Sequence, residues 1–282
     1  MTDSGKVRAR ATGRGLLADA VFAVGLRLAD GTTWSCAATG DGSKTIVHRL
    51  ADIMQLRPMT DPCDATVVVT PAEALCRSPR ASLDLRMPSF LVEVSRAVGE
   101  AVQARGGLLL HGGLAENQPG GYGVILAGPS GAGKSTASLR LHWPWRSLSD
   151  DAVLVVRDRE GAYWAHPWPT RSAFLPGGSG GSWDVGYAVL LKGIFYLEHG
   201  EYVHAERLGP GHAVCLLMQS AEQTFWPRGS GHPQGNVTRL RGERFSNVCA
   251  LAQAVPAFHL RMDRVSPFWE AMAQVVGDGR CA

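Results

Sequence analysis

The residues most able to do chemistry lie in one glycine-rich segment, GPSGAGKST, at positions 128 to 136. Gly128, Gly133, Lys134 and Ser135 fit the pattern Gly-x-x-x-x-Gly-Lys-Ser/Thr. Glycines allow the backbone to curl until its N–H groups point inward at phosphate oxygens. The lysine of such a loop reaches the β- and γ-phosphates, and the hydroxyl is a ligand for Mg²⁺. The segment therefore predicts a site for a nucleoside triphosphate and Mg²⁺.

Two features of the surrounding sequence strengthen this prediction. A β-rich apolar segment precedes the loop and helix-compatible residues follow it, which is the context that the pattern requires. Lysine is also rare, because Lys6, Lys44, Lys134 and Lys192 are the lysines of the whole chain. The pattern by itself leaves open whether the nucleotide is ATP or GTP. The residues expected to bind it are Gly128, Ser130, Gly131, Ala132, Gly133, Lys134, Ser135 and Thr136.

Paired carboxylates follow the loop closely, at Asp150 and Asp151 in the triplet SDD. Neighbouring side chains on extended chain point to opposite sides, so the two carboxylates can have different roles. One can join Ser135 in binding Mg²⁺, while the other takes the proton from an acceptor hydroxyl. Such a triplet is usually a solvated turn, but its position just after a phosphate loop favours the chemical interpretation.

A histidine precedes the loop, at the end of the predicted strand LLLH and directly before Gly112 and Gly113. If this strand lies beside the strand that leads into the loop, His111 faces the same phosphate region. It would then donate a hydrogen bond to a phosphate or shuttle a proton. A purely structural histidine at a strand end is the alternative interpretation.

The composition limits the classes of function. The 282 residues are 45% apolar and 19% charged, which is typical of a globular protein. The net charge of +3 is too small to indicate a nucleic-acid or membrane partner. None of the six cysteines forms a Cys-x-x-Cys pair, the N-terminus has no secretory apolar region, and no apolar run has the length of a membrane span. We therefore expect reduced thiols and a cytoplasmic location.

The elements that must position these residues show both strand and helix patterns. Residues 18 to 37 predict a hairpin that turns at Asp30–Gly31, and residues 89 to 107 predict a helix that Ser89 caps and Gly106 ends. The other strands are expected at 65–70, 108–113, 122–128, 188–198 and 257–262. Residues 145–156 are expected to form two short strands, or one bent strand, with the paired aspartates between. The other helices are expected near 47–56, 134–141, 243–254 and 267–276.

The segment at 226–242 is rich in Pro, Gly and Arg. We expect it to be a surface loop. Because arginines suit acidic partners, a clamp for an acceptor peptide is the alternative.

The stretch LLLHGG … GVILAGPSGAGKSTASLRLHWPWRSLSDDAVLV resembles HPr kinase/phosphorylase. That family has a histidine–glycine strand, a phosphate loop, a short helix and paired aspartates in this order and at this short spacing. The resemblance implies that Asp150 acts as the base on a serine hydroxyl and that Asp151 helps to hold Mg²⁺. It also implies a P-loop fold with a mixed sheet, similar to HPr kinase and phosphoenolpyruvate carboxykinase.

The similarity extends over about residues 90 to 265 and is closest to the shortened HPr-kinase-like proteins of peptide-modification gene clusters. The stretch HPWPTRSAFLPGGSGGSWDVGYAVLLKGIFYLE looks like the HPr-kinase-like member of the SynChlorMet cassette. Similar kinases in lasso-peptide clusters phosphorylate a serine of the precursor peptide. The second HPr-kinase signature, a Glu-Arg-Gly stretch tied to phosphorolysis, has no counterpart here. Its absence argues against the reverse reaction and against HPr as the substrate.

The sequence therefore predicts an α/β protein with a small α+β region at residues 1–88 and an HPr-kinase-like nucleotide-binding domain at residues 89–282. We expect an ATP- and Mg²⁺-dependent serine kinase that acts on a peptide or protein of a biosynthetic cluster, such as a cassette precursor peptide. The alternatives are a nucleotide-binding accessory module without phosphotransfer and a small-metabolite kinase. Full-length HPr kinases are hexamers, so the resemblance leaves a homo-oligomer open.

Overall fold

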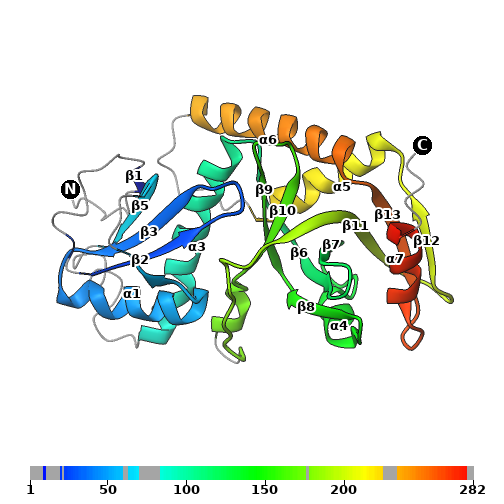
Figure 1. Cartoon of the computed structure of the whole chain (residues 1–282), viewed down its shortest axis with the longest axis horizontal. Helices are drawn as coiled ribbons and strands as arrows, with labels where there is room; N and C mark the ends of the chain where they lie inside the picture. The colour runs from blue at the N-terminus through cyan, green and yellow to red at the C-terminus, as the bar shows by residue number, and fades with distance from the viewer. Residues whose placement is uncertain are drawn as a thin grey trace. The chain divides into compact units, whose positions relative to one another are not determined.

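The computed structural model describes residues 9–10, 20, 22–59, 63–69, 83–175, 178–224 and 234–277. Within these ranges the chain forms two mixed β-sheets and six α-helices (Figure 1). The α/β class predicted from the sequence is confirmed. By its internal contacts the chain divides into two units. The first comprises Met1–Ala101 and Pro169–Tyr187, and the second comprises Val102–Trp168 and Ala188–Ala282.

The sheet of the first unit is built around the predicted hairpin. Its strand order is β1-β5-β3-β2-β4, with β3 parallel to β5 and the other neighbours antiparallel. Gly31, with φ of 84°, closes the hairpin turn by donating its N–H to the carbonyl of Leu28. The hairpin prediction is therefore confirmed. The strands are β1 (Ala9–Arg10), β2 (Phe22–Arg27), β3 (Thr33–Ala38), β4 (Arg57–Pro58) and β5 (Ala65–Val69).

Two helices belong to the first unit, α1 (Asp41–Met54) and most of α3 (Leu83–Gln103), together with the short 3₁₀ helix η2 (Arg171–Phe174). The prediction that Ser89 caps α3 is wrong, because the helix begins at Leu83. Met87 and Phe90 are both buried, so the apolar face of α3 extends past Ser89 toward the N-terminus. Burial of that face outweighs the capping preference of a single serine.

The second unit contains an eight-stranded sheet with the order β10-β9-β6-β7-β11-β13-β12, and β8 pairs with β6. Strand β11 is parallel to both β7 and β13, and it also meets β10. The strands are β6 (Leu108–Asn117), β7 (Tyr122–Ala127), β8 (Trp145–Ser149), β9 (Ala152–Arg157), β10 (Tyr163–Trp168), β11 (Val189–His199), β12 (His204–Arg207) and β13 (Ala257–Met262).

Helices cover both faces of this second sheet, as Figure 1 shows. On one face, α4 (Lys134–Arg140) and α7 (Phe268–Gly277) enclose a core that includes Phe195, Leu197 and Phe268. On the other face lie α5 (Pro210–Gln223) and α6 (Gln234–Ala254). Side chains alternate along a strand, so Tyr196 points to the face opposite its neighbours Phe195 and Leu197, the side of α5.

The loop predicted at 226–242 is wrong for residues 234–242, because they belong to helix α6. The chain is helical from Gln234 onward, and residues 226–233 lie outside the described residues. Leu240 and Arg244 are buried in this helix. The Gln103 side chain donates to the Leu240 carbonyl at 2.8 Å and accepts from Arg244 Nε at 3.2 Å. These tertiary contacts outweigh the weak helix propensity of the glycine- and arginine-rich sequence.

Two further observations concern the helices and the cysteines. No helix within the described ranges combines the length and apolar character needed to span a bilayer. None of the cysteines that the described ranges include takes part in a disulfide bond; these are Cys36, Cys63, Cys215 and Cys249.

Candidate nucleotide and phosphoryl-transfer site

The glycine-rich segment forms the turn between the buried strand β7 and helix α4, so the predicted strand–loop–helix context is confirmed. Gly128, Gly131 and Gly133 have φ values of 155°, 82° and 91°, a region that favours glycine. A Cβ atom on Gly128 would lie 2.9 Å from the Cβ of Ala132. The glycines of the pattern are therefore required by the path of the loop. Ser130 and Gly131 are exposed at its tip, while Ala132 packs into the core.

Lys134 lies beneath the loop at the start of α4, and it is 8% exposed. Its Nζ donates hydrogen bonds to the carbonyls of Gly128 at 2.9 Å and Pro129 at 3.0 Å. Burial lowers the pKa of Lys134, and the negative charge of Asp151 acts in the opposite direction. The ammonium group is thus held against the first residues of the loop. Ser135 and Thr136 follow it on exposed positions of α4.

The paired aspartates lie between two short strands, β8 and β9, as the sequence predicted. Both strands pair with β6, and this pairing holds the aspartates at one point of the sheet. Ser149 Oγ donates to the carbonyl of Ala152 at 2.8 Å, and Gly112 N donates to the carbonyl of Asp151 at 2.9 Å. The backbone on both sides of the carboxylates is therefore fixed.

His111 lies inside β6, which continues to Asn117, so the prediction that His111 ends its strand is wrong. The strand continues because β7 pairs with it in antiparallel register from Gly112 to Asn117. The imidazole Nδ1 is 3.2 Å from Asp151 Oδ1. Burial lowers the pKa of His111, and the charge of Lys134 lowers it further, while Asp151 raises it. The neutral imidazole is therefore the favoured form.

The fold thus brings together residues that are far apart in sequence. His111 interacts with both Lys134 and Asp151, and Lys134 also interacts with Asp151. The backbone of Asp150 lies next to β6, because a Cβ atom on Gly113 would be 3.6 Å from the Asp150 Cα, which is ordinary van der Waals contact. Lys134, Asp151 and His111 therefore form one electrostatically linked cluster.

Comparison with protein families identifies the chain. The family model described as SynChlorMet cassette protein ScmC matches residues 75–277, which is more than half of the sequence. The chain belongs to the ScmC family. The matched residues include the phosphate loop, the paired aspartates and His111. A search of curated proteins finds no match to the chain.

The donor set of this ScmC-family protein fits Mg²⁺. Ser135 offers a hydroxyl and Asp151 a carboxylate, both oxygen ligands. Within the described ranges, no group of three or more His, Cys, Asp or Glu side chains could hold a metal ion. Mg²⁺ does not need such a group, because it is bound through one or two carboxylates together with substrate phosphates and water.

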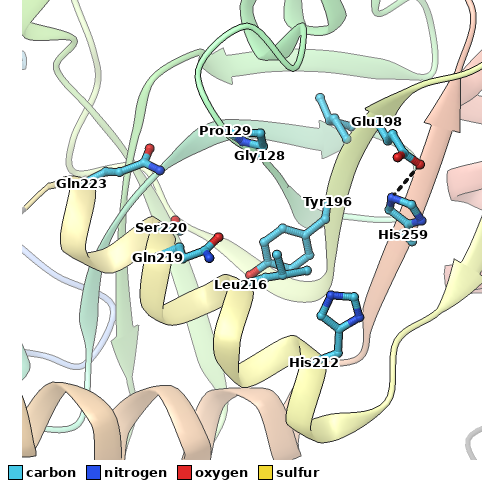
Figure 2. Close-up of a pocket in the computed structure, with 11 residues that line it drawn as sticks. Gly128, Pro129, Tyr196, Glu198, His212, Leu216, Gln219, Ser220, Gln223 and His259 are labelled. Atoms are coloured by element: carbon cyan, nitrogen blue, oxygen red, sulfur yellow. Dashed lines mark ion pairs between the residues drawn. The ribbon is translucent and has the colours of Figure 1, made fainter.

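A cavity of about 210 Å³ opens beside the loop and was not predicted from the sequence. Figure 2 shows that Gly128 and Pro129 line one side, Tyr196 the centre and helix α5 the other side. Along α5, His212, Leu216, Gln219, Ser220 and Gln223 recur at helical spacing and all line the cavity. This spacing could have been recognised in the sequence as one face of a helix. The strand that carries Tyr196 shows only the pattern of a buried apolar strand, which gives no indication of a cavity.

Replacement of Gly128 by alanine tests the loop geometry. We expect Gly128→Ala to weaken nucleotide binding at least about tenfold, because the added Cβ meets Ala132 and the backbone must leave its left-handed conformation. Gly209→Ala is the matched control, since Gly209 has no atom within 4 Å of an added Cβ. Titration with a fluorescent ATP analogue measures both variants. Equal affinity of Gly128→Ala and wild type would contradict the assignment of the loop.

Proposed function

We propose that this ScmC-family protein is an ATP- and Mg²⁺-dependent kinase of the HPr-kinase type. Its acceptor is a serine hydroxyl on a peptide or protein of its own biosynthetic cassette, and the reaction takes place in the cytoplasm. The proposal includes an HPr-kinase-like P-loop fold for the second unit, with its mixed sheet, and a phosphate loop that leads from β7 into α4.

One observation carries the proposal. Asp151, the second residue of the SDD triplet, has its Oδ1 atom 3.2 Å from His111 Nδ1, and its charge acts on the phosphate-loop lysine, Lys134. In a solvated turn, the alternative interpretation of that triplet, the carboxylate would have no reason to pair with a half-buried histidine. A lysine and a carboxylate at the exit of a phosphate loop suit the transfer of a phosphoryl group, in which positioning and charge neutralisation supply most of the catalysis.

Each residue of the cluster has a chemical task in this proposal. The loop amides and Lys134 bind the β- and γ-phosphates, and Lys134 offsets negative charge on the transferred group. Ser135 and Asp151 hold Mg²⁺, which when bound neutralises charge on the phosphate oxygens. Asp150 accepts the proton of the serine hydroxyl as that oxygen attacks phosphorus. The proton thus ends on the Asp150 carboxylate, and ADP leaves.

His111 supports this chemistry as a neutral imidazole. Its Nδ1 faces Asp151 Oδ1 at 3.2 Å, so a hydrogen bond there orients the carboxylate that would hold the metal. The other ring nitrogen is then an acceptor for a proton of the bound reactants. An imidazole kept neutral adds no further positive charge beside Lys134.

The decisive experiment incubates purified protein with Mg²⁺–ATP and the precursor peptide of its cassette. Mass spectrometry of the peptide should show the gain of one phosphoryl group on a serine. Tight nucleotide binding without transfer to that peptide would instead favour the accessory-module alternative. Transfer to a small metabolite in preference to the peptide would favour the metabolite-kinase alternative.

Removal of the metal gives a second expected result. Excess EDTA should reduce phosphoryl transfer to background, and added Mg²⁺ should restore it, because only one carboxylate and one hydroxyl hold the ion. Circular dichroism should be unchanged by EDTA, since no structural element depends on the ion. Transfer that persists in EDTA would contradict the assignment of Ser135 and Asp151.

A further inference from the structure

The cavity beside the phosphate loop is bounded by the same segments that carry the proposed catalytic residues. One wall consists of Gly128 and Pro129. Their carbonyls are the groups that accept hydrogen bonds from Lys134 Nζ. A phosphate-loop lysine serves the β- and γ-phosphates. The cavity therefore adjoins the end of the nucleotide from which the phosphoryl group departs.

The opposite wall, helix α5, is attached to the strand that carries His111. Ser220 Oγ donates to the carbonyl of His111 at 2.9 Å. Thr224 Oγ1 donates to the carbonyl of Leu109 at 2.8 Å. Both bonds hold α5 against β6. Residues on the exposed face of α5, including Gln219 and Gln223, therefore keep a fixed distance from the catalytic cluster.

Tyr196 supplies an independent observation. The residue is 4% exposed, yet its hydroxyl has no hydrogen-bond partner among the residues that the structure describes. Figure 2 shows the ring extending from its strand toward α5, among the cavity residues. A buried hydroxyl without a partner is costly, and native proteins usually pair such groups with protein or ligand. The hydroxyl is therefore an unsatisfied donor of a residue that lines the cavity.

The size and charge of the cavity limit its occupant. Its volume of about 210 Å³ is below the range of about 300–1,000 Å³ of pockets for whole small molecules. Glu198 at its rim pairs with Arg261 at 3.2 Å, which offsets its charge, and its Oε2 atom lies 3.1 Å from His259 Nε2. The tyrosine hydroxyl and the amides of Gln219 and Gln223 can all donate hydrogen bonds. These features suit one side chain with an accepting oxygen.

We propose that this cavity is an acceptor subsite, which takes a single amide- or carboxylate-bearing side chain of the polypeptide substrate next to the serine that is phosphorylated. The subsite specifies how the proposed kinase recognises its acceptor, and the inference rests on that proposed function. Tyr196 donates its hydroxyl hydrogen to the oxygen of the incoming side chain. Leu216 contacts the apolar stem of that side chain. The subsite selects the acceptor and takes no part in nucleotide binding.

Tyr196→Phe tests the proposal through two dissociation constants. One is for the fluorescently labelled cassette precursor peptide, and the other is for a non-hydrolysable ATP analogue with Mg²⁺. We expect peptide binding to weaken about two- to tenfold, the range of one hydrogen bond, and nucleotide binding to stay unchanged. Tyr163→Phe is the matched control, because Tyr163 is 3% exposed and its hydroxyl also has no partner within the described part of the chain, but it lies outside the cavity.

Gln219→Trp provides a second test, because the larger side chain fills the cavity from the exposed face of α5. We expect it to abolish peptide binding and to preserve nucleotide binding and the thermal midpoint. If either cavity variant weakens nucleotide binding as much as peptide binding, or if neither affects the peptide, the proposal is overturned. A wild-type protein that does not bind the peptide overturns it as well.

The same measurements separate this proposal from the proposed function. If wild type binds peptide and nucleotide but transfers no phosphoryl group, kinase activity fails and the cavity variants still report on the binding site. If wild type phosphorylates the peptide and neither Tyr196→Phe nor Gln219→Trp changes the peptide affinity, the subsite fails and the kinase stands.

Discussion

Asp150→Asn should reduce the rate of phosphoryl transfer to the cassette peptide by at least about a hundredfold, the lower end of the range for loss of a general base. The amide has nearly the shape of the carboxylate but cannot accept the serine proton. Nucleotide affinity should remain within about twofold of wild type, because Lys134 and the loop amides are unchanged. Single-turnover transfer from radiolabelled ATP measures the rate, and analogue titration measures the affinity.

The control for this substitution is Asp52→Asn, which makes the same chemical change on the exposed side of α1. It should leave both transfer and binding unchanged. If Asp150→Asn transfers phosphate at the wild-type rate, Asp150 is not the base. Loss of transfer in Asp151→Asn alone, with Asp150→Asn active, would reverse the roles that the HPr-kinase resemblance implies for the two carboxylates.

Lys134→Met should weaken nucleotide binding about ten- to a hundredfold, the range expected for loss of a hydrogen bond to a charged group. Methionine has a similar unbranched stem, so it can fill the space beneath the loop without the ammonium group. The substitution also removes the donor to the Gly128 and Pro129 carbonyls, and the loop loses that support. Transfer should fall further than binding, since Lys134 also offsets charge on the transferred group.

Lys192→Met is the matched control, because Lys192 is an exposed lysine on β11 of the same unit. It should bind nucleotide as wild type does. Thermal unfolding of both variants separates a loss of binding from a loss of fold. If a folded Lys134→Met variant bound nucleotide with wild-type affinity, the phosphate loop would have no role in the proposed mechanism.

Local sequence was sufficient to predict the parts of the site that depend on neighbouring residues. The glycines at 128, 131 and 133 are needed for backbone angles that other residues rarely adopt, so the loop is visible in the sequence. The strands beside Asp150 and Asp151, and the hairpin at Asp30–Gly31, were predictable for the same reason. Turn chemistry and strand periodicity act over a few residues.

Contacts between distant segments could not be predicted in this way. Helix α6 is held at Leu240 and Arg244 by Gln103, which lies more than a hundred residues away in the sequence. The exact register of β6 against β9 is what places His111 Nδ1 3.2 Å from Asp151 Oδ1. A one-residue slip would turn His111 to the other face of the sheet.

The order of residues along the chain was therefore enough to predict the phosphate loop and the paired carboxylates. The expected chemistry follows from these two features. The pairing of His111 with Asp151, the burial of Lys134 and the cavity at Tyr196 came from the packing of β6, β7, β11 and α5. Burial changes the pKa of a lysine or histidine and leaves a tyrosine hydroxyl without water. Those effects exist only where segments distant in sequence exclude solvent together.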